Sequence, residues 1–357
     1  MGCGGSKPEA DWDKDFDSPG SPAKAQEQKG PRVGVCSFES QYITRFPKVP
    51  TDVPADCKEL NIADNELLSA LDGVGALTEL EKLDANSCAL TKVPDEIEGC
   101  KSLKELLLYK NKLKELSPKL GVLAALETLN IFNNQVKKLP PELGQLTNLE
   151  EVNAAANKLM MLTDAHFTGW ASVKVLSLYD NNLVRMGSLA PLVALEELRL
   201  YGNNLEAMPT LSSHPALTTY EIYKNRITAI DPDYFGATPN LQRLSIQGNG
   251  LEALPPSLQK CSKLVGVQAQ ENKLKAVPGG AWPATLETLF VQDNSGEAFS
   301  LPAELKKCKK LKRINLSRLK LDEASASTAE AIKLMVLKQP EGMFWGVDGK
   351  KQAAAKK

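Results

Sequence analysis

The stretch LKELLLYKNKL at residues 103–113 recurs along the chain with the same spacing of apolar residues and the same polar residue near its end. Close copies are LETLNIFNNQV at 126–136, LEELRLYGNNL at 195–205 and LQRLSIQGNGL at 241–251. They fit the pattern L-x-x-L-x-L-x-x-N-x-L. The position of the asparagine is filled in turn by Asn65, Cys88, Asn111, Asn134, Asn157, Asn181, Asn203, Asn225, Asn249, Asn272 and Asn294. A fixed period of about 23 residues predicts a stack of similar units.

Each part of this pattern has a physical role in such a stack. The L-x-L core predicts a short strand whose alternate residues point inward. The asparagine side chain can bond to backbone groups in the turn that would otherwise be buried without a partner. A single unit cannot bury its own apolar side, but neighbouring units bury it for one another. The sequence therefore predicts an α/β solenoid, with a curved parallel sheet on the concave face and short helical or extended segments on the convex face.

This pattern resembles the leucine-rich repeat family, and the resemblance covers about residues 33–321. The second half of several units has the form L-P-x-x-L, as in LPPELGQLTNL at 139–149 and LPAELKKCKKL at 301–311. This form resembles the intracellular 23-residue subclass found in Ras-pathway scaffolds and cell-polarity proteins. Two units depart from it, TDAHFTGWASV at 163–173 and IDPDYFGATPN at 230–240. They look like the phenylalanine-bearing convex segments of receptor-type repeats.

The two ends of the solenoid are expected to be capped. No leucine precedes Leu60, so we assign residues 33–59 to a degenerate N-terminal cap and residues 60–321 to the repeats. A capping helix is predicted over 322–338, begun by the pair Ser327 and Glu330,. Residues 339–357 are predicted to be a flexible tail, in which Phe344 and Trp345 either pack on the cap or form a docking peptide.

The chain begins MGCGGSK, which fits the N-myristoylation pattern with Gly2 as the acceptor,. One myristoyl chain gives only marginal membrane binding, so stable anchoring needs a second signal. Residues 7–32 carry five basic and six acidic side chains and are not polybasic. Palmitoylation of Cys3 is therefore the predicted second signal. We interpret residues 1–32 as an acylated, disordered tether, with a chance match in a glycine-rich start as the alternative.

The composition gives little material for catalysis. The net charge is −1, which supplies no basic excess for binding nucleic acid, and His166 and His214 are the only two histidines,. The sequence contains no phosphate-binding loop, dinucleotide fingerprint, zinc-protease motif or kinase signature,. We expect no enzyme activity, no cofactor, no metal ion and no small-molecule substrate. Cys100, Cys261 and Cys308 occupy an apolar core position, which favours a reducing, cytoplasmic location,.

The repeat register predicts which side chains share the concave face. One column, two residues before each asparagine, contains Tyr109, Phe132, Tyr179, Tyr201 and Tyr223. Aromatic side chains aligned on a rigid sheet are typical of protein-binding hot spots, although they also stabilise sheets by packing on one another. Leu107 adds an apolar contact, and glutamates such as Glu151 and Glu197 form an acidic rim that Arg199 interrupts. These residues are the candidate partner-binding site.

The leading hypothesis is a non-catalytic scaffold or adaptor in intracellular signalling. It would be peripheral on the inner face of the plasma membrane or on another cytosol-facing membrane. The resemblance to Ras-group repeats implies a small GTPase, a kinase or a phosphatase as the protein partner. The alternative is a regulatory subunit of a protein phosphatase or another signalling enzyme. A pattern-recognition receptor for glycan or lipid is less favoured, because no secretory signal is recognised in the sequence.

Overall fold

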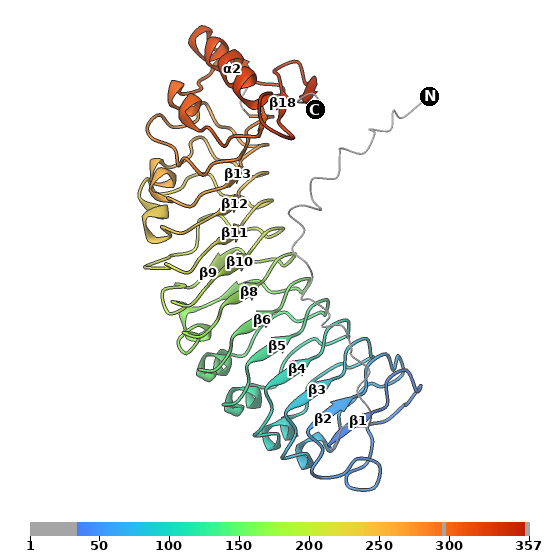
Figure 1. The fold of residues 1–357 in the computed structure, drawn as a ribbon. Helices are drawn as coiled ribbons and strands as arrows, with labels where there is room; N and C mark the ends of the chain where they lie inside the picture. The colour runs from blue at the N-terminus through green and yellow to red at the C-terminus, as the bar shows by residue number, and fades with distance from the viewer. Residues whose placement is uncertain (1–33, 295–297, 354–357) are drawn as a thin grey trace, which may run out of the picture.

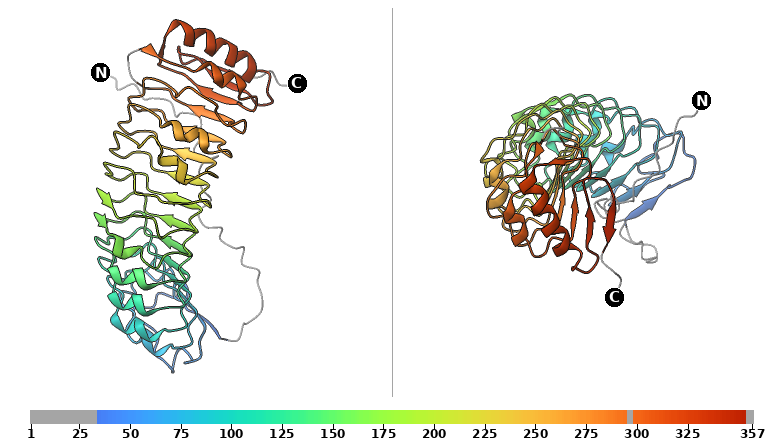
Figure 2. Two further views of the ribbon diagram at one scale, coloured as in Figure 1. Left: turned by 90° about the vertical axis from the view of Figure 1, so that its left-hand side faces the viewer. Right: turned by 90° about the horizontal axis from the view of Figure 1, so that it is seen from above.

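The computed structural model describes residues 34–294 and 298–353. The chain winds into a curved solenoid, with the strands on its inner side and short helical turns on its outer side (Figure 1). Two further views show the same elongated arc, with helix α2 (Glu323–Val336) near its C-terminal end (Figure 2). The leucine-rich repeat solenoid predicted from the sequence is confirmed. Gly2 and Cys3, the predicted acylation sites, lie outside the described residues.

The concave face is one sheet with a three-residue strand from each unit. In spatial order its strands are β1 (Val35–Ser37), β2 (Glu59–Asn61), β3 (Lys82–Asp84), β4 (Glu105–Leu107), β5 (Thr128–Asn130), β6 (Glu151–Asn153), β8 (Val175–Ser177), β10 (Glu197–Arg199), β11 (Thr219–Glu221), β12 (Arg243–Ser245), β13 (Gly266–Gln268), β14 (Thr288–Phe290), β16 (Arg313–Asn315), β18 (Met343–Trp345) and β19 (Lys351–Ala353). All neighbours are parallel except β18 and β19.

The convex side is built mainly from single 3-10 turns, which settles the choice between helical and extended segments in most units. They are η1 (Val74–Ala76), η2 (Asp95–Gly99), η3 (Pro118–Val122), η4 (Pro141–Gln145), η5 (Asp164–His166), η6 (Tyr234–Ala237), η7 (Pro256–Lys260) and η8 (Ala303–Lys307). Two small parallel sheets join β7 (Met161–Leu162) to β9 (Arg185–Met186), and β15 (Ala298–Phe299) to β17 (Lys320–Leu321). Proline at the first turn of η3, η4 and η7 suits this geometry, because its φ is already helical,.

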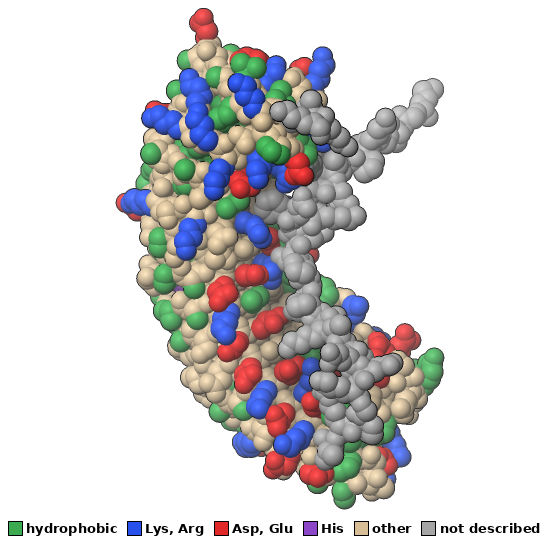
Figure 3. Space-filling view, in the orientation of Figure 1, with side chains coloured by type: hydrophobic (Ala, Val, Ile, Leu, Met, Phe, Trp, Pro, Cys, Tyr) green, Lys and Arg blue, Asp and Glu red, His purple; other side chains and the backbone are tan. Residues whose placement is uncertain are grey.

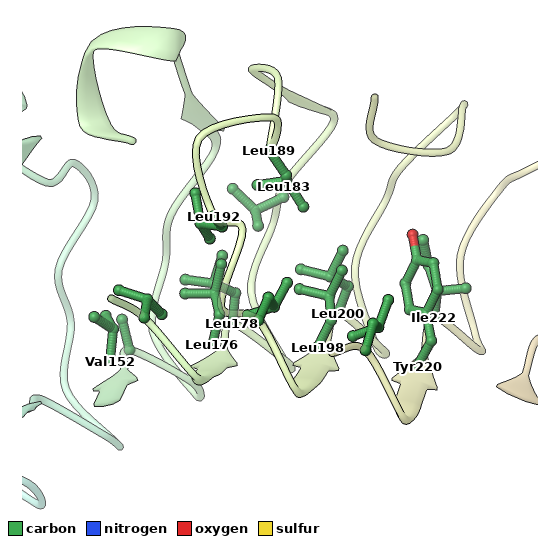
Figure 4. Packing of buried hydrophobic residues seen from close by; sticks show 14 of the residues in the cluster. Val152, Leu176, Leu178, Leu183, Leu189, Leu192, Leu198, Leu200, Tyr220 and Ile222 are labelled. Atoms are coloured by element: carbon green, nitrogen blue, oxygen red, sulfur yellow. The ribbon is translucent and has the colours of Figure 1, made fainter. Parts of the chain in front are cut away.

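The repeated leucines form one continuous core between the two faces. Leu176, Leu198 and Tyr220 occupy the middle of successive strands and point into the interior, where convex residues such as Leu192 meet them (Figure 4). Cys100, Cys261 and Cys308 are buried in this core, as predicted. Burial raises the pKa of the Cys100 and Cys261 thiols to about 11, so both are protonated at neutral pH,.

The asparagine ladder connects each unit to the one before it. The Asn134 amide donates to the backbone oxygens of Ile131 in its own unit and Leu108 in the preceding unit, at 3.0 and 2.9 Å. Its side-chain oxygen accepts from the backbone N–H of Leu113 at 2.9 Å. Cys88 replaces one asparagine, and its thiol donates to the Ile62 carbonyl at 3.3 Å. The predicted role of the asparagine is confirmed, and it extends across the junction between units.

The N-terminal cap continues the solenoid as an irregular unit. Strand β1 pairs in parallel with β2, so the sheet begins before the first leucine. The ladder asparagine Asn65 donates to the Phe38 backbone oxygen at 2.9 Å and accepts from the backbone N–H of Ile43 at 3.0 Å. A unit that has Gln41 at its own asparagine position is therefore held by the asparagine of its neighbour.

The C-terminal cap differs from the prediction in two respects. Helix α2 (Glu323–Val336) is present, but its N-cap is Asp322, whose carboxylate accepts from the backbone N–H of Ser325 at 2.7 Å. Ser327 and Glu330 lie within the helix, so the predicted capping box is wrong. The predicted flexible tail contains β18 and β19, and Phe344 is buried opposite Ile314. Because β16 would otherwise leave an unpaired edge, pairing of β18 satisfies its backbone groups.

Candidate partner-binding site

An aromatic ladder runs along the concave face and consists of Phe132, Tyr179, Tyr201 and Tyr223. The rings of Tyr179 and Tyr201 are stacked with centroids 4.5 Å apart, and those of Tyr201 and Tyr223 with centroids 4.4 Å apart. All four side chains are half-buried. The predicted column is therefore present, and its tyrosines form a continuous stack one strand apart.

Phe132 joins this ladder across a unit that has only a small side chain. The unit of strand β6 lies between the unit of Phe132 and that of Tyr179. In this unit Ala155 occupies the equivalent position and has no exposed surface. The centroids of Phe132 and Tyr179 are 6.2 Å apart, less than the roughly 9.6 Å that two strand spacings would give,. The two rings therefore lean toward each other over Ala155 and close the gap.

The hydroxyls of Tyr179 and Tyr201 stay protonated at physiological pH. Burial raises the pKa of Tyr201, and the neighbouring hydroxyls of Tyr223 and Tyr179 raise it further. The pKa of Tyr179 is raised mainly by burial as well. The ladder therefore presents aromatic faces together with neutral hydroxyl groups that donate and accept hydrogen bonds.

Leu107 and Tyr109 extend the candidate site toward the N-terminal units. Both side chains are half-buried. The pKa of Tyr109 is raised by burial and then by the carboxylates of Asp84 and Asp64. The acidic character that the sequence predicted is thus present at this end of the concave face, although Asp84 and Asp64 were not among the predicted residues.

Three glutamines continue the same column beyond the aromatic ladder, and the sequence reasoning did not assign them to the site. The side-chain oxygens of Gln247, Gln270 and Gln292 are buried, and none has a hydrogen-bond partner among residues 34–294 and 298–353. A buried carbonyl oxygen without a partner is costly, so this row of glutamines is less well satisfied than the tyrosine stack. The repeat register places these residues in one row, which is the signal that identifies them.

The acidic rim predicted from the sequence, which also includes Glu105 and Glu150, is partly paired with basic side chains. Glu105 is paired with Lys82 at 2.6 Å, and Glu150 with Lys174 at 2.7 Å. Figure 3 shows acidic and basic side chains intermixed on the visible face of these units. Each lysine comes from the neighbouring unit, about one repeat away in sequence. Inspection of single units therefore did not show that these glutamates have basic partners.

Arg199 belongs to a network of charged and polar side chains on the strands beside the aromatic ladder. Its guanidinium is ion-paired with Glu197 and lies 3.6 Å from the carboxylate of Glu221 on the next strand. It also donates to the Ser177 hydroxyl at 3.3 Å. Glu151 is half-buried on β6, two strands from Glu197. These charged residues therefore fix the sheet surface beside the aromatic ladder more than they supply free charge for a partner.

The two histidines are structural. His166 Nδ1 accepts from the backbone N–H of Thr163 at 3.0 Å, and Nε2 lies 3.1 Å from the Leu139 carbonyl, so the ring joins two units. His214 has no exposed surface, and its Nε2 lies 3.0 Å from the Leu189 carbonyl. In the part of the chain that the structure describes, no group of three or more metal-ligating side chains is found.

We expect the buried His214 to make the free energy of unfolding depend on pH. Burial lowers the pKa of its imidazole, so the unfolded chain binds more protons than the folded chain once the pH falls below the ordinary value near 6.5,. The free energy of unfolding should then decrease with falling pH, by up to about 1.4 kcal/mol per pH unit, until the pH passes below the lowered pKa. Urea unfolding at pH 7.5 and 5.5 measures this loss.

The variant His214→Leu provides the comparison. Leu123, Leu146 and Leu192 occupy the equivalent position in other units. The variant also removes a buried Nδ1 that has no partner among the described residues. We expect it to be at least as stable as the wild type at pH 7.5 and to lose less stability at pH 5.5. If the variant loses as much stability between pH 7.5 and pH 5.5 as the wild type does, His214 is not the source of the pH dependence.

The repeat pattern, the solenoid and its concave face define a class of protein. Two family models, both described as leucine rich repeat, match residues 147–205 and 240–261. The chain has the leucine-rich repeat fold, and these two parts of it match the repeat's family models. The matched models are general for the repeat and select neither the intracellular nor the receptor-type subclass. No curated protein matches the chain by sequence.

Several solved structures are similar to this one. The Arabidopsis receptor kinase HAESA, solved in complex with the peptide hormone IDA and the co-receptor SERK1, is 26% identical with a TM-score of 0.61, over 73% of this chain and 46% of that one. YopM from Yersinia enterocolitica is 22% identical with a TM-score of 0.57, over 78% of this chain and 58% of that one. A leucine-rich repeat protein of Leptospira interrogans is 21% identical with a TM-score of 0.49, over 94% and 99% of the two chains. This chain thus spans about half the length of the first two.

Among the described residues, no helix has the length and apolar character needed to cross a bilayer.

Proposed function

We propose that this protein is a non-catalytic scaffold or adaptor that binds a protein partner on its concave face. It is held by acyl chains on Gly2 and Cys3 at the cytosolic face of a membrane. The observation that carries the proposal is the aromatic ladder from Phe132 to Tyr223, stacked on a rigid parallel sheet. A flat row of half-buried aromatic rings offers a large apolar contact area at little conformational cost.

The chemistry of the column favours a peptide segment of the partner that lies across the strands. Apolar or aromatic side chains of that segment pack on the tyrosine rings, and its N–H groups donate to the neutral tyrosine hydroxyls. Glu105, Glu150 and Glu197 of the rim are ion-paired, so an apolar anchor fits the ladder better than a basic one. A similar solenoid, that of the receptor kinase HAESA, has been solved with a peptide hormone.

The sequence of the N-terminus supports the membrane tether. The pattern MGCGGSK supplies an acceptor glycine and an adjacent cysteine, which together provide the two acyl chains that stable anchoring needs,. Tethering raises the local concentration of the concave face near a membrane-bound partner. The L-P-x-x-L units resemble those of Ras-pathway scaffolds and support a partner in intracellular signalling.

We expect the triple variant Tyr179→Ala, Tyr201→Ala, Tyr223→Ala to lose its partner. Truncating one hot-spot side chain costs about 2 kcal/mol or more, equivalent to about 30-fold in affinity. Affinity capture with quantitative mass spectrometry compares the wild type with the variant. The matched control replaces the same three tyrosines with phenylalanine, which keeps the rings and should retain most of the captured protein. Equal capture by the alanine variant would refute the ladder as the binding site.

The tether is tested in cells by proximity labelling of the wild type and of Gly2→Ala. We expect the wild type to label membrane-associated neighbours and to sediment with membranes, whereas Gly2→Ala should do neither. Metabolic labelling with a fatty-acid analogue should be lost in Gly2→Ala and reduced in Cys3→Ser. Membrane association of Gly2→Ala equal to that of the wild type would show that acylation is not the anchor.

A further inference from the structure

One flank of the solenoid carries a basic surface that neither the concave face nor the tether accounts for. It is formed by the residues that follow the ladder position in five consecutive units, 89–92, 112–115, 135–138, 158–161 and 182–185. Its basic side chains, all exposed, are Lys92, Lys112, Lys114, Lys137, Lys138, Lys158 and Arg185. Glu115 is the one acidic side chain in these five segments. We call this set the basic flank.

Backbone contacts between units hold the basic flank in regular rows. The backbone N–H of Lys112 donates to the Leu90 carbonyl at 2.9 Å, and that of Lys158 to the Val136 carbonyl at 2.9 Å. Lys137 is joined in the same way to Lys114 at 3.4 Å. Five units at a strand spacing of about 4.8 Å give a surface roughly 19 Å long. The charges are therefore fixed on one side of a rigid frame.

The basic side chains have no competing partners among the described residues. No ion pair or side-chain hydrogen bond involves Lys112, Lys114, Lys137, Lys138 or Lys158 there, whereas Lys82, Lys104 and Lys174 on the other side of the strands are all paired with glutamates. The basic flank is thus a region of uncompensated positive charge on a chain whose net charge is −1. Such a region attracts an anionic surface.

Exposed apolar side chains complete the same rows. Met160 and Met161 have 61% and 58% of their surface exposed, and Val184 has 37%. They are adjacent, because the backbone N–H of Val184 donates to the Met160 carbonyl at 3.1 Å. The positions equivalent to Met160 in the two preceding units are Lys137 and Lys114. Neighbouring apolar and basic side chains on one surface suit the interface of an anionic bilayer, where methionine enters the acyl boundary and lysine meets the headgroups.

We propose that the basic flank docks the solenoid on a membrane rich in anionic phospholipid. The inference rests on the membrane location in the proposed function and adds a contact made by the folded domain. Residues 7–32 are not polybasic, so the electrostatic attraction that usually accompanies an acyl chain is supplied by the solenoid itself,. Docking by a flank orients the solenoid with its edge on the bilayer, which leaves the aromatic ladder open to a partner.

The test uses the full chain carrying Gly2→Ala, so that acylation plays no part. Flotation with vesicles of phosphatidylcholine alone, or with about a quarter phosphatidylserine, measures binding at low and high salt. We expect binding only to the anionic vesicles, and weaker binding at high salt. Each lysine near an anionic surface contributes about fivefold in affinity, so Lys137→Ala, Lys138→Ala should bind roughly 30-fold more weakly.

The chain offers a matched control in Lys273→Ala, Lys275→Ala. These two lysines are equally exposed and lie in the same rows, but five units away from Lys158 and beyond the basic flank. We expect less than a twofold change in this control. Met160→Ser, Met161→Ser keeps the charge and should weaken binding by roughly tenfold or more through lost apolar burial.

The inference is overturned if neutral and anionic vesicles bind equally, or if the control variant loses as much affinity as Lys137→Ala, Lys138→Ala. Retention on an immobilised acidic peptide without any vesicle binding would instead assign the basic flank to an acidic protein. Because the test protein carries Gly2→Ala, failure here leaves the acyl tether untouched. Conversely, an unacylated Gly2 in cells would leave vesicle binding by the flank intact.

Discussion

Replacing one ladder asparagine, Asn181→Ala, should lower the free energy of unfolding by about 3 kcal/mol. The Asn181 amide donates to the backbone oxygens of Ala154 and Leu178, each at 3.0 Å, and its side-chain oxygen accepts from the backbone N–H of Leu159 at 3.0 Å. These bonds lie in the interior and connect two units. Alanine leaves the Leu159 N–H buried without a partner, which costs about 1–3 kcal/mol, and removes one of the two amide donors from each carbonyl, since Ala154 keeps Asn157 and Leu178 keeps Asn203,.

The neighbouring residue supplies the control for this prediction. Asn182 has the same side chain but is exposed, so Asn182→Ala should change stability by less than about 0.5 kcal/mol,. Thermal unfolding followed by circular dichroism compares the two variants, and a loss of 3 kcal/mol corresponds to a fall in Tm of about 5 °C for a domain of this size. If both variants have the same Tm as the wild type, the asparagine ladder does not stabilise the contact between units.

The fold was predictable because every unit repeats the same strand and turn with the same buried residues. An apolar pair in L-x-L and an asparagine three residues after its second member fix a strand and a turn, and repetition of the pattern fixes the register between units. Tyr179, Tyr201 and Tyr223 were identified for the same reason, since equivalent positions in successive units must be neighbours on the sheet. What the register could not supply was the stacking of the rings and the way Phe132 leans over Ala155.

The failures occurred where residues from different units act together, or where the repeat ends. The glutamates of the rim were counted within single units, whereas Lys82 and Lys174 neutralise two of them from the adjacent strands. Strand β18 follows helix α2 and begins 30 residues after β16 begins, so the period of about 23 residues could not reveal it. Asp322 acts as the helix N-cap more than one turn before the serine that the capping-box pattern selected.

A second class of contact between units was not visible in the repeat pattern, and it predicts a large effect for Gly144→Ala. Gly144 lies in η4, and a Cβ atom there would be 2.0 Å from the backbone oxygen of Ala165 in η5. Because that oxygen belongs to the backbone, the two convex turns would have to move apart. The Thr168 hydroxyl, which donates to the Gly144 carbonyl at 3.1 Å, would also be displaced. We expect a loss of about 3 kcal/mol, the upper part of the range for overpacking a core.

Gly236→Ala tests whether this effect comes from the close approach or from losing any glycine on the convex side. Gly236 lies in the convex turn η6, and a Cβ atom there meets no other atom within 4 Å. The added methyl group should restrict the unfolded chain and leave stability unchanged or raised by up to about 1 kcal/mol. Urea unfolding midpoints, with the m-values compared, separate the two variants. Equal destabilisation of both would contradict the steric explanation, and no destabilisation of Gly144→Ala would show that η4 and η5 tolerate a wider spacing. The expected contrast would show that the close approach of η4 and η5, like the asparagine ladder, stabilises the packing of successive units.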